Sequence, residues 1–201
     1  MRSLPILLMA AGLSAATPAE DLQKGIDLYT AYRFEQAESV LRGASSAEPD
    51  NPRILYYLGL TLLHLDKNAE AQEVLLKADQ AGPASADIKL GLAWAYTNQG
   101  DFPKAEAALA EAKQINADSP DLPYYRGLLE LAQKQYQAAA NDFETAIKGA
   151  PNNAYAHYYA GMAYSRLNRP DRMLAHFQQF VKMAPDAPEA GKVRSVLQTL
   201  R

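Results

Sequence analysis

A repeat of 34 residues constrains this chain more than any other feature of its sequence. Steps of 34 from Gly161 toward the N-terminus reach only small residues, which are Gly127, Ala93, Gly59 and Gly25. The same steps from Pro185 reach Pro151, Ala117, Pro83 and Pro49. A fixed period of this length indicates an array of similar units that bury their apolar faces against one another. The sequence predicts five units across residues 20–187, at 18–51, 52–85, 86–119, 120–153 and 154–187.

Each unit is predicted to be a helical hairpin. An apolar-periodic helix is followed by a polar turn and then by a helix rich in alanine. The small residues at the period positions would let the two helices approach more closely than the ~8–10 Å that larger side chains allow. Prolines after Asn51 and Ser119 are predicted to occupy the first turn of a helix, where a missing N–H is no loss.

The order of residue types within a unit resembles the tetratricopeptide repeat. In the last unit the matching positions are His157, Ala160, Gly161, Tyr164, Met173, Phe177 and Pro185. The resemblance implies an all-α, right-handed superhelical solenoid of five helix-turn-helix repeats. After the last repeat, residues 188–201 are predicted to form a C-terminal capping helix with an apolar face of Val193, Val196, Leu197 and Leu200.

The first 19 residues have the order of a secretory signal peptide. Arg2 is followed by an apolar run from Leu4 to Leu13 and then by small residues that suit cleavage near Ala16 or Ala19. The run is shorter than the ~20 residues that a membrane-spanning helix needs. We therefore expect a protein secreted across the inner membrane and located in the bacterial periplasm. The alternative is an N-terminal helix that caps the array.

Composition argues against several classes of function. A net charge of -3 gives little attraction for nucleic acid, and no basic patch indicates a direct membrane anchor. Cysteine is absent, so disulfides and thiolate metal sites are excluded. His64, His157 and His176 lack the three- or four-residue spacing of a helical metal pair, and no catalytic motif is present. We expect no cofactor, no metal and no enzymatic activity.

A binding surface is the better-supported interpretation. In arrays that resemble this one, the first helices line the concave side, which would carry an aromatic and aliphatic groove. The predicted groove residues are Tyr56, Leu60, Leu90, Trp94, Tyr124, Leu128, Tyr158 and Met162. Tyrosine and tryptophan dominate binding hot spots, and Trp94 is the only tryptophan. The competing interpretation is that these side chains pack between neighbouring first helices as core.

These features predict a non-enzymatic scaffold or adaptor of the bacterial cell envelope that binds a protein or peptide partner. The positions matching a chaperone-tail clamp carry no lysine or arginine, so an apolar peptide or helix fits the groove better. One alternative is a self-assembling structural subunit. Another is an accessory enzyme with an unrecognised site.

Overall fold

The computed structural model describes residues 16–199, and within them the chain forms eleven α-helices and no strand. The first helices of the five hairpins are α1 (Pro18–Thr30), α3 (Pro52–His64), α5 (Ala86–Asn98), α7 (Leu122–Ala132) and α9 (Ala154–Arg166). The second helices are α2 (Phe34–Ala47), α4 (Asn68–Ala81), α6 (Phe102–Ile115), α8 (Tyr136–Gly149) and α10 (Pro170–Met183). A final helix, α11 (Ala190–Thr199), follows them.

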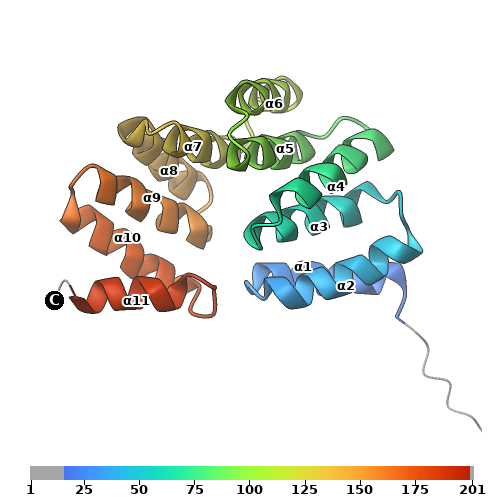
Figure 1. Ribbon diagram of the computed structural model, residues 1–201, viewed down its shortest axis with the longest axis horizontal. Coiled ribbons are helices and arrows are strands. Elements are labelled where there is room, and N and C mark those ends of the chain that lie inside the picture. The colour runs from blue at the N-terminus through green and yellow to red at the C-terminus, as the bar shows by residue number, and fades with distance from the viewer. Residues whose placement is uncertain (1–15, 200–201) are drawn as a thin grey trace, which may run out of the picture.

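The hairpins follow one another along an arc, with α1 and α2 at one end and α9 to α11 at the other (Figure 1). All five second helices begin 34 residues apart, and four of the five first helices keep the same spacing. Each helix packs chiefly on its partner in the hairpin and on the neighbouring hairpin. The predicted all-helical solenoid of five helix-turn-helix repeats is therefore confirmed.

The glycine column sets how closely the two helices of a hairpin approach. A Cβ atom placed on Gly59 would lie 2.5 Å from Cγ of Leu75, and one on Gly161 would lie 2.5 Å from Cδ1 of Phe177. The contacts of Gly25 and Gly127 are equivalent, with Leu41 and Phe143. A small residue against a large one therefore seals each of these hairpins, as the predicted close approach requires.

The turn inside every hairpin has the same backbone geometry. One residue in each turn has a φ between 55° and 76°, and these residues are Tyr32, Asp66, Gly100, Lys134 and Asn168. In the first turn the N–H of Arg33 donates to the carbonyl of Leu28 at 2.9 Å, and an equivalent bond closes the other four. This is the Schellman arrangement, which satisfies carbonyl groups left free at the helix end.

The fourth repeat breaks the period at its start. Helix α7 begins at Leu122, so the prediction that Pro120 opens this helix is wrong. The physical reason is Pro123, which lies in the first turn of α7. In a helix beginning at Pro120, residue 123 would have to donate the first intrahelical hydrogen bond, and proline has no N–H. Pro52, by contrast, does lie in the first turn of α3 as predicted.

The two ends of the array differ. Helix α11 packs on α10 and buries Ala190 and Val193, as a capping helix should. At the other end, Thr17 and Glu20 form a capping box before α1. The predicted signal peptide lies largely outside the described residues. No helix within residues 16–199 combines the length and apolar character needed to cross a bilayer.

Candidate functional site

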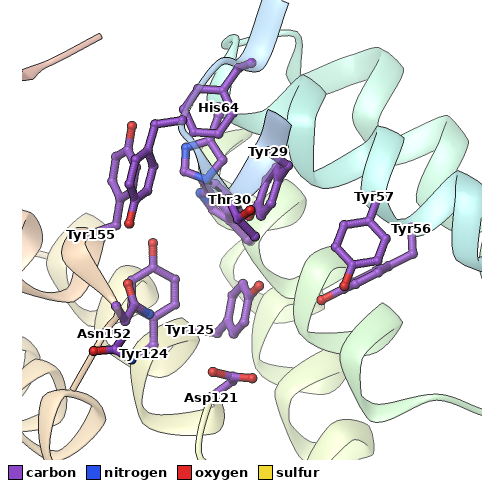
Figure 2. Close-up of a pocket in the computed structure, with 14 residues that line it drawn as sticks. Tyr29, Thr30, Tyr56, Tyr57, His64, Asp121, Tyr124, Tyr125, Asn152 and Tyr155 are labelled. Carbon is purple, nitrogen blue, oxygen red and sulfur yellow. Dashed lines mark hydrogen bonds between the residues drawn. The ribbon is translucent and has the colours of Figure 1, made fainter. Parts of the chain in front are cut away.

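The concave side of the array holds a cavity of about 510 Å³, to which all five first helices contribute. We call this space the concave cavity. Its aromatic lining consists of Tyr29, Tyr32, Phe34, Tyr56, Tyr57, His64, Trp94, Tyr124, Tyr125 and Tyr155. Thr30, Asp121, Asn152 and Asn153 complete the wall. Figure 2 shows the rings arranged around a common space, with Asp121 at its edge.

His64 is the centre of the ring packing on one side of the concave cavity. Its imidazole stacks on Phe34 with 4.1 Å between centroids and meets the Trp94 ring edge-on at 4.8 Å. Its Nε2 lies 3.4 Å from the hydroxyl of Tyr29. Burial among these rings lowers the pKa of His64 to about 3, so the imidazole is neutral at physiological pH.

Tyr155 joins the last repeat to the first two. Its ring centroid lies 4.5 Å from that of His64 and 5.7 Å from that of Tyr32. Its hydroxyl donates to Glu189 at 2.7 Å, which fixes the ring on the side of the last repeat. The arc in Figure 1 is therefore bridged on its concave side by one aromatic side chain.

The electrostatic environment of the concave cavity is negative. Asp121 is the only lysine, arginine, aspartate or glutamate in its lining. Burial, and then the charge of Asp87, raise the pKa of Asp121. Burial likewise raises the pKa of Tyr29, Tyr56 and Tyr125, and for all three the carboxylate of Asp121 raises it further. These hydroxyls stay protonated at physiological pH, and the charges acting on them are negative.

Asp121 differs from the residues that precede the other first helices. The side chains of Thr17, Asn51, Ser85 and Asn153 each accept a hydrogen bond from a backbone N–H in the first turn of the helix that follows. Asp121 makes no such bond. Within residues 16–199 it also has no ion-pair partner within 4.0 Å. Its carboxylate is therefore available to a ligand in the cavity.

The structure divides the predicted groove residues into three groups. Tyr56, Trp94 and Tyr124 line the concave cavity together, although Trp94 is only 3% exposed. Leu60, Leu90 and Leu128 are buried in the core between the helices. Tyr158 packs on Phe177 and Phe180, and Met162 lines a separate hollow with Tyr136 and Arg166. A binding role for these eight residues stays a prediction.

Several residues of the concave cavity gave no signal in the column pattern. Tyr29 and His64 are at the ends of first helices, and Tyr32 is the left-handed residue of a turn. Asp121 could have been noticed, because Pro123 two residues later makes a helix start at Pro120 unfavourable. The contact of Tyr155 with the first repeats depends on the curvature of the whole array, which no local pattern reports.

The histidines are arranged differently from what their spacing indicated. His157 and His176 lie on neighbouring helices, and their Nδ1 atoms approach to 3.1 Å. Glu144 accepts at 3.2 Å from Nε2 of His176, and burial together with His176 lowers the pKa of His157. Among the described residues no group of three His, Cys, Asp or Glu could hold a metal ion. The pair is best explained as a hydrogen-bonded contact between α9 and α10.

The fold and the cavity define a class: helical-hairpin solenoids whose first helices surround a concave site. Models of the tetratricopeptide repeat match residues 22–86 and 124–190, and a further one matches 76–130. The chain belongs to the tetratricopeptide repeat family. Proteins of this family mediate protein–protein interactions, and the family is a scaffold fold.

Known proteins resemble the chain over most of its length. It is 22% identical to anaphase-promoting complex subunit 3 of Schizosaccharomyces pombe, over 85% of this chain and 26% of that protein. It is 26% identical to peroxisome biogenesis protein 5 of Arabidopsis thaliana, over 79% of this chain and 21% of that protein. The chain thus spans about a quarter or less of the length of these two relatives.

Solved structures share the fold. A thermophilic TPR protein of Thermus thermophilus superposes with a TM-score of 0.73 at 21% identity, covering 91% of this chain and 98% of that one. The hetero-tetramer of Cut9 and Hcn1 from the APC/C contains a chain that matches with a TM-score of 0.70 at 15% identity, over 92% of this chain and 36% of that one. At these identities the likeness supports the architecture alone.

Proposed function

We propose that this protein is a non-enzymatic adaptor that binds a peptide segment of a partner protein in the concave cavity. The observation that carries the proposal is the convergence of all five first helices on one aromatic space. Protein interaction is the general role of the family, and tyrosine-rich surfaces bury much area at small entropic cost. No described cluster of residues favours the alternative of an accessory enzyme.

The size of the concave cavity suits part of a peptide. Ligand sites typically have volumes of ~300–1,000 Å³, and about 510 Å³ falls within that range. Such a space receives a few side chains and excludes a folded domain. Tyr56 and Tyr57 are half-buried and also line the adjacent hollow of about 270 Å³, so the chain of a bound peptide has a continuous path past them.

Site-specific photo-crosslinking in the native host tests this proposal. A photoreactive residue at Tyr56 is expected to capture a partner protein, because this side chain borders both hollows. The matched control is Ile115, an exposed apolar residue at the end of α6, which should capture none. The same adducts from both positions would contradict binding in the concave cavity. Adducts only with a second copy of the chain would favour a self-assembling subunit.

We also propose that the adaptor works in the bacterial cell envelope. The proposal rests on the signal-like order of residues 1–19. Cleavage after Ala16 would leave the Thr17 capping box intact, whereas cleavage after Ala19 would remove it. N-terminal sequencing of the protein from a periplasmic extract is expected to begin at Thr17. An intact N-terminus in the cytoplasmic fraction would overturn this location.

A further inference from the structure

We propose that the concave cavity recognises a basic side chain, lysine or arginine, of the partner peptide. The cation would lie beside Asp121 and against the rings of Tyr56 and Tyr125. This inference rests on the proposed peptide-binding function and specifies the chemistry of the peptide. The experiment below separates a failure of the one from a failure of the other.

The first step is the placement of the Asp121 carboxylate. It lies at the only first-helix start among the described repeats that departs from the 34-residue spacing. The later start of α7 leaves Asp121 outside the regular helix, and its side chain makes no capping bond. Asp121 borders the concave cavity, where Figure 2 shows it at the edge of the space that the tyrosine rings surround. A half-buried carboxylate without a partner is stabilised by an incoming cation.

The second step is the chemistry of the rings. The face of an aromatic ring carries partial negative charge and attracts ammonium and guanidinium groups, more strongly when water is excluded. Tyr56 and Tyr57 meet edge-on at 5.2 Å between centroids, and Tyr124 and Tyr125 do so at 5.1 Å. Each pair therefore presents ring faces in two directions. These pairs lie on α3 and α7, in the wall that also contains Asp121.

The third step is that the lining supplies no cation of its own. No lysine or arginine lines the concave cavity, and His64 is held neutral by burial. Arg53 lies in the adjacent hollow, which it shares with Asp87. Asp87 thus has a basic neighbour in its own hollow, whereas Asp121 has none in the cavity that it borders. The negative charge at Asp121 is left for the ligand to balance.

The fourth step selects a side-chain cation over other positive ligands. The described residues provide no group of three ligands for a metal ion. A lysine or arginine side chain combines a long apolar stem with a terminal charge, so it can cross the aromatic wall and place its cation at the carboxylate. An aromatic lining with one acid matches that combination.

Selection from a random 12-residue peptide library displayed on phage tests the inference. The wild-type chain, the cavity variant Tyr56→Ser and the variant Asp121→Asn would each be panned. Peptides from the wild type are expected to be rich in lysine or arginine next to apolar residues, and to bind Tyr56→Ser weakly. Peptides selected on Asp121→Asn should lose the preference for basic residues. Asp118→Asn, an exposed position in the same connection, is the matched control and should keep it.

A double-mutant cycle then measures the contact. For one selected peptide, replacing its basic residue by norleucine is expected to weaken binding to the wild type about tenfold, and to leave binding to Asp121→Asn nearly unchanged. Asp121 makes no capping bond, so Asp121→Asn should fold normally, which a thermal melt would verify.

The outcomes are distinct. Cavity-dependent peptides without basic residues, or with an excess of acidic ones, would overturn the cation inference and leave peptide binding intact. An equal effect of norleucine on wild type and Asp121→Asn would overturn it too. If no selected peptide is sensitive to Tyr56→Ser, the proposed function fails together with the inference.

Discussion

Two columns of the repeat, both on the first helices, behave in opposite ways. Gly25, Gly59, Gly127 and Gly161 face a large side chain of their own hairpin and are nearly invariant along the chain. The column that begins at the second residue of the same helices reads Ala19, Arg53, Asp87, Asp121 and Tyr155. Its last two members border the concave cavity. One column repeats a contact, and the other changes at every step.

The difference shows which residues build the scaffold and which individualise it. A repeat array is stabilised by equivalent interfaces, so positions inside a hairpin must carry the same shape each time. Positions on the concave side are free of that requirement. Asp121 and Tyr155 differ in charge and size although they occupy equivalent places, so the concave cavity has a chemistry that the period does not dictate.

Trp94 should be the most costly side chain to remove, because it serves both regions. It lines the concave cavity but is only 3% exposed and packs on His64 and Tyr125. Trp94→Ala is expected to lower the free energy of unfolding by about 4 kcal/mol. Urea denaturation would measure the loss. A loss below about 1 kcal/mol would show that Trp94 belongs to an open binding surface and not to the scaffold.

A matched pair of glycine substitutions tests the hairpin interface. In Gly161→Ala the new Cβ would meet the ring of Phe177 at 2.5 Å, so we expect a loss of about 2 kcal/mol from overpacking. In Gly43→Ala, on α2, the Cβ meets nothing within 4 Å, and removal of a helical glycine should add up to about 1 kcal/mol. Thermal melts of both variants check the sign. Equal changes would refute the role given to the glycine column.

Glu130 tests a carboxylate in the scaffold. Its Oε2 is buried without a hydrogen-bond partner, and burial followed by the charge of Asp142 raises its pKa to about 7. The folded state therefore holds an extra proton between the unfolded pKa of ~4.5 and about 7, and stability falls as pH rises through that window. Glu130→Gln should remove this loss. After solvent screening we expect a gain of about 1 kcal/mol at pH 8 and little change at pH 4. A gain of the same size at both pH values would contradict this origin.

Asp121 should affect stability least. It makes no capping bond and no ion pair with the described residues, and its raised pKa shows that burial disfavours the charge. Asp121→Asn is expected to change the free energy of unfolding by less than about 0.5 kcal/mol, in the stabilising direction, at neutral pH. Urea denaturation beside Asn51→Ala, which loses a real helix cap, supplies the comparison. That variant should lose about 1 kcal/mol. A similar loss in both would mean that Asp121 also serves the scaffold.

The sequence predicted the scaffold better than the site. The period placed the turns and the glycine contacts, because these depend on neighbours within one hairpin. It placed Tyr56, Trp94 and Tyr124 on the concave side for the same reason. It did not predict that α7 starts at Leu122, since proline chemistry overrode the period there.

The rest of the site depends on the shape of the whole array. Tyr155 meets Tyr32 and His64 only because the hairpins curve enough to bring the two ends together. That curvature is the sum of small rotations between neighbouring repeats, and no single residue reports it. Leu60, Leu90 and Leu128 show the same limit, because apolar residues on the predicted concave side proved to be core.

The central claim is that ligands enter the concave cavity, and Trp94 provides its most direct test. It is the only tryptophan in the chain and lies in the cavity wall, so its fluorescence reports on that space alone. Titration with the tightest peptide from the wild-type selection is expected to shift its emission, with a midpoint equal to the dissociation constant from calorimetry. Saturable binding by calorimetry with unchanged Trp94 emission would place the ligand elsewhere and contradict the claim.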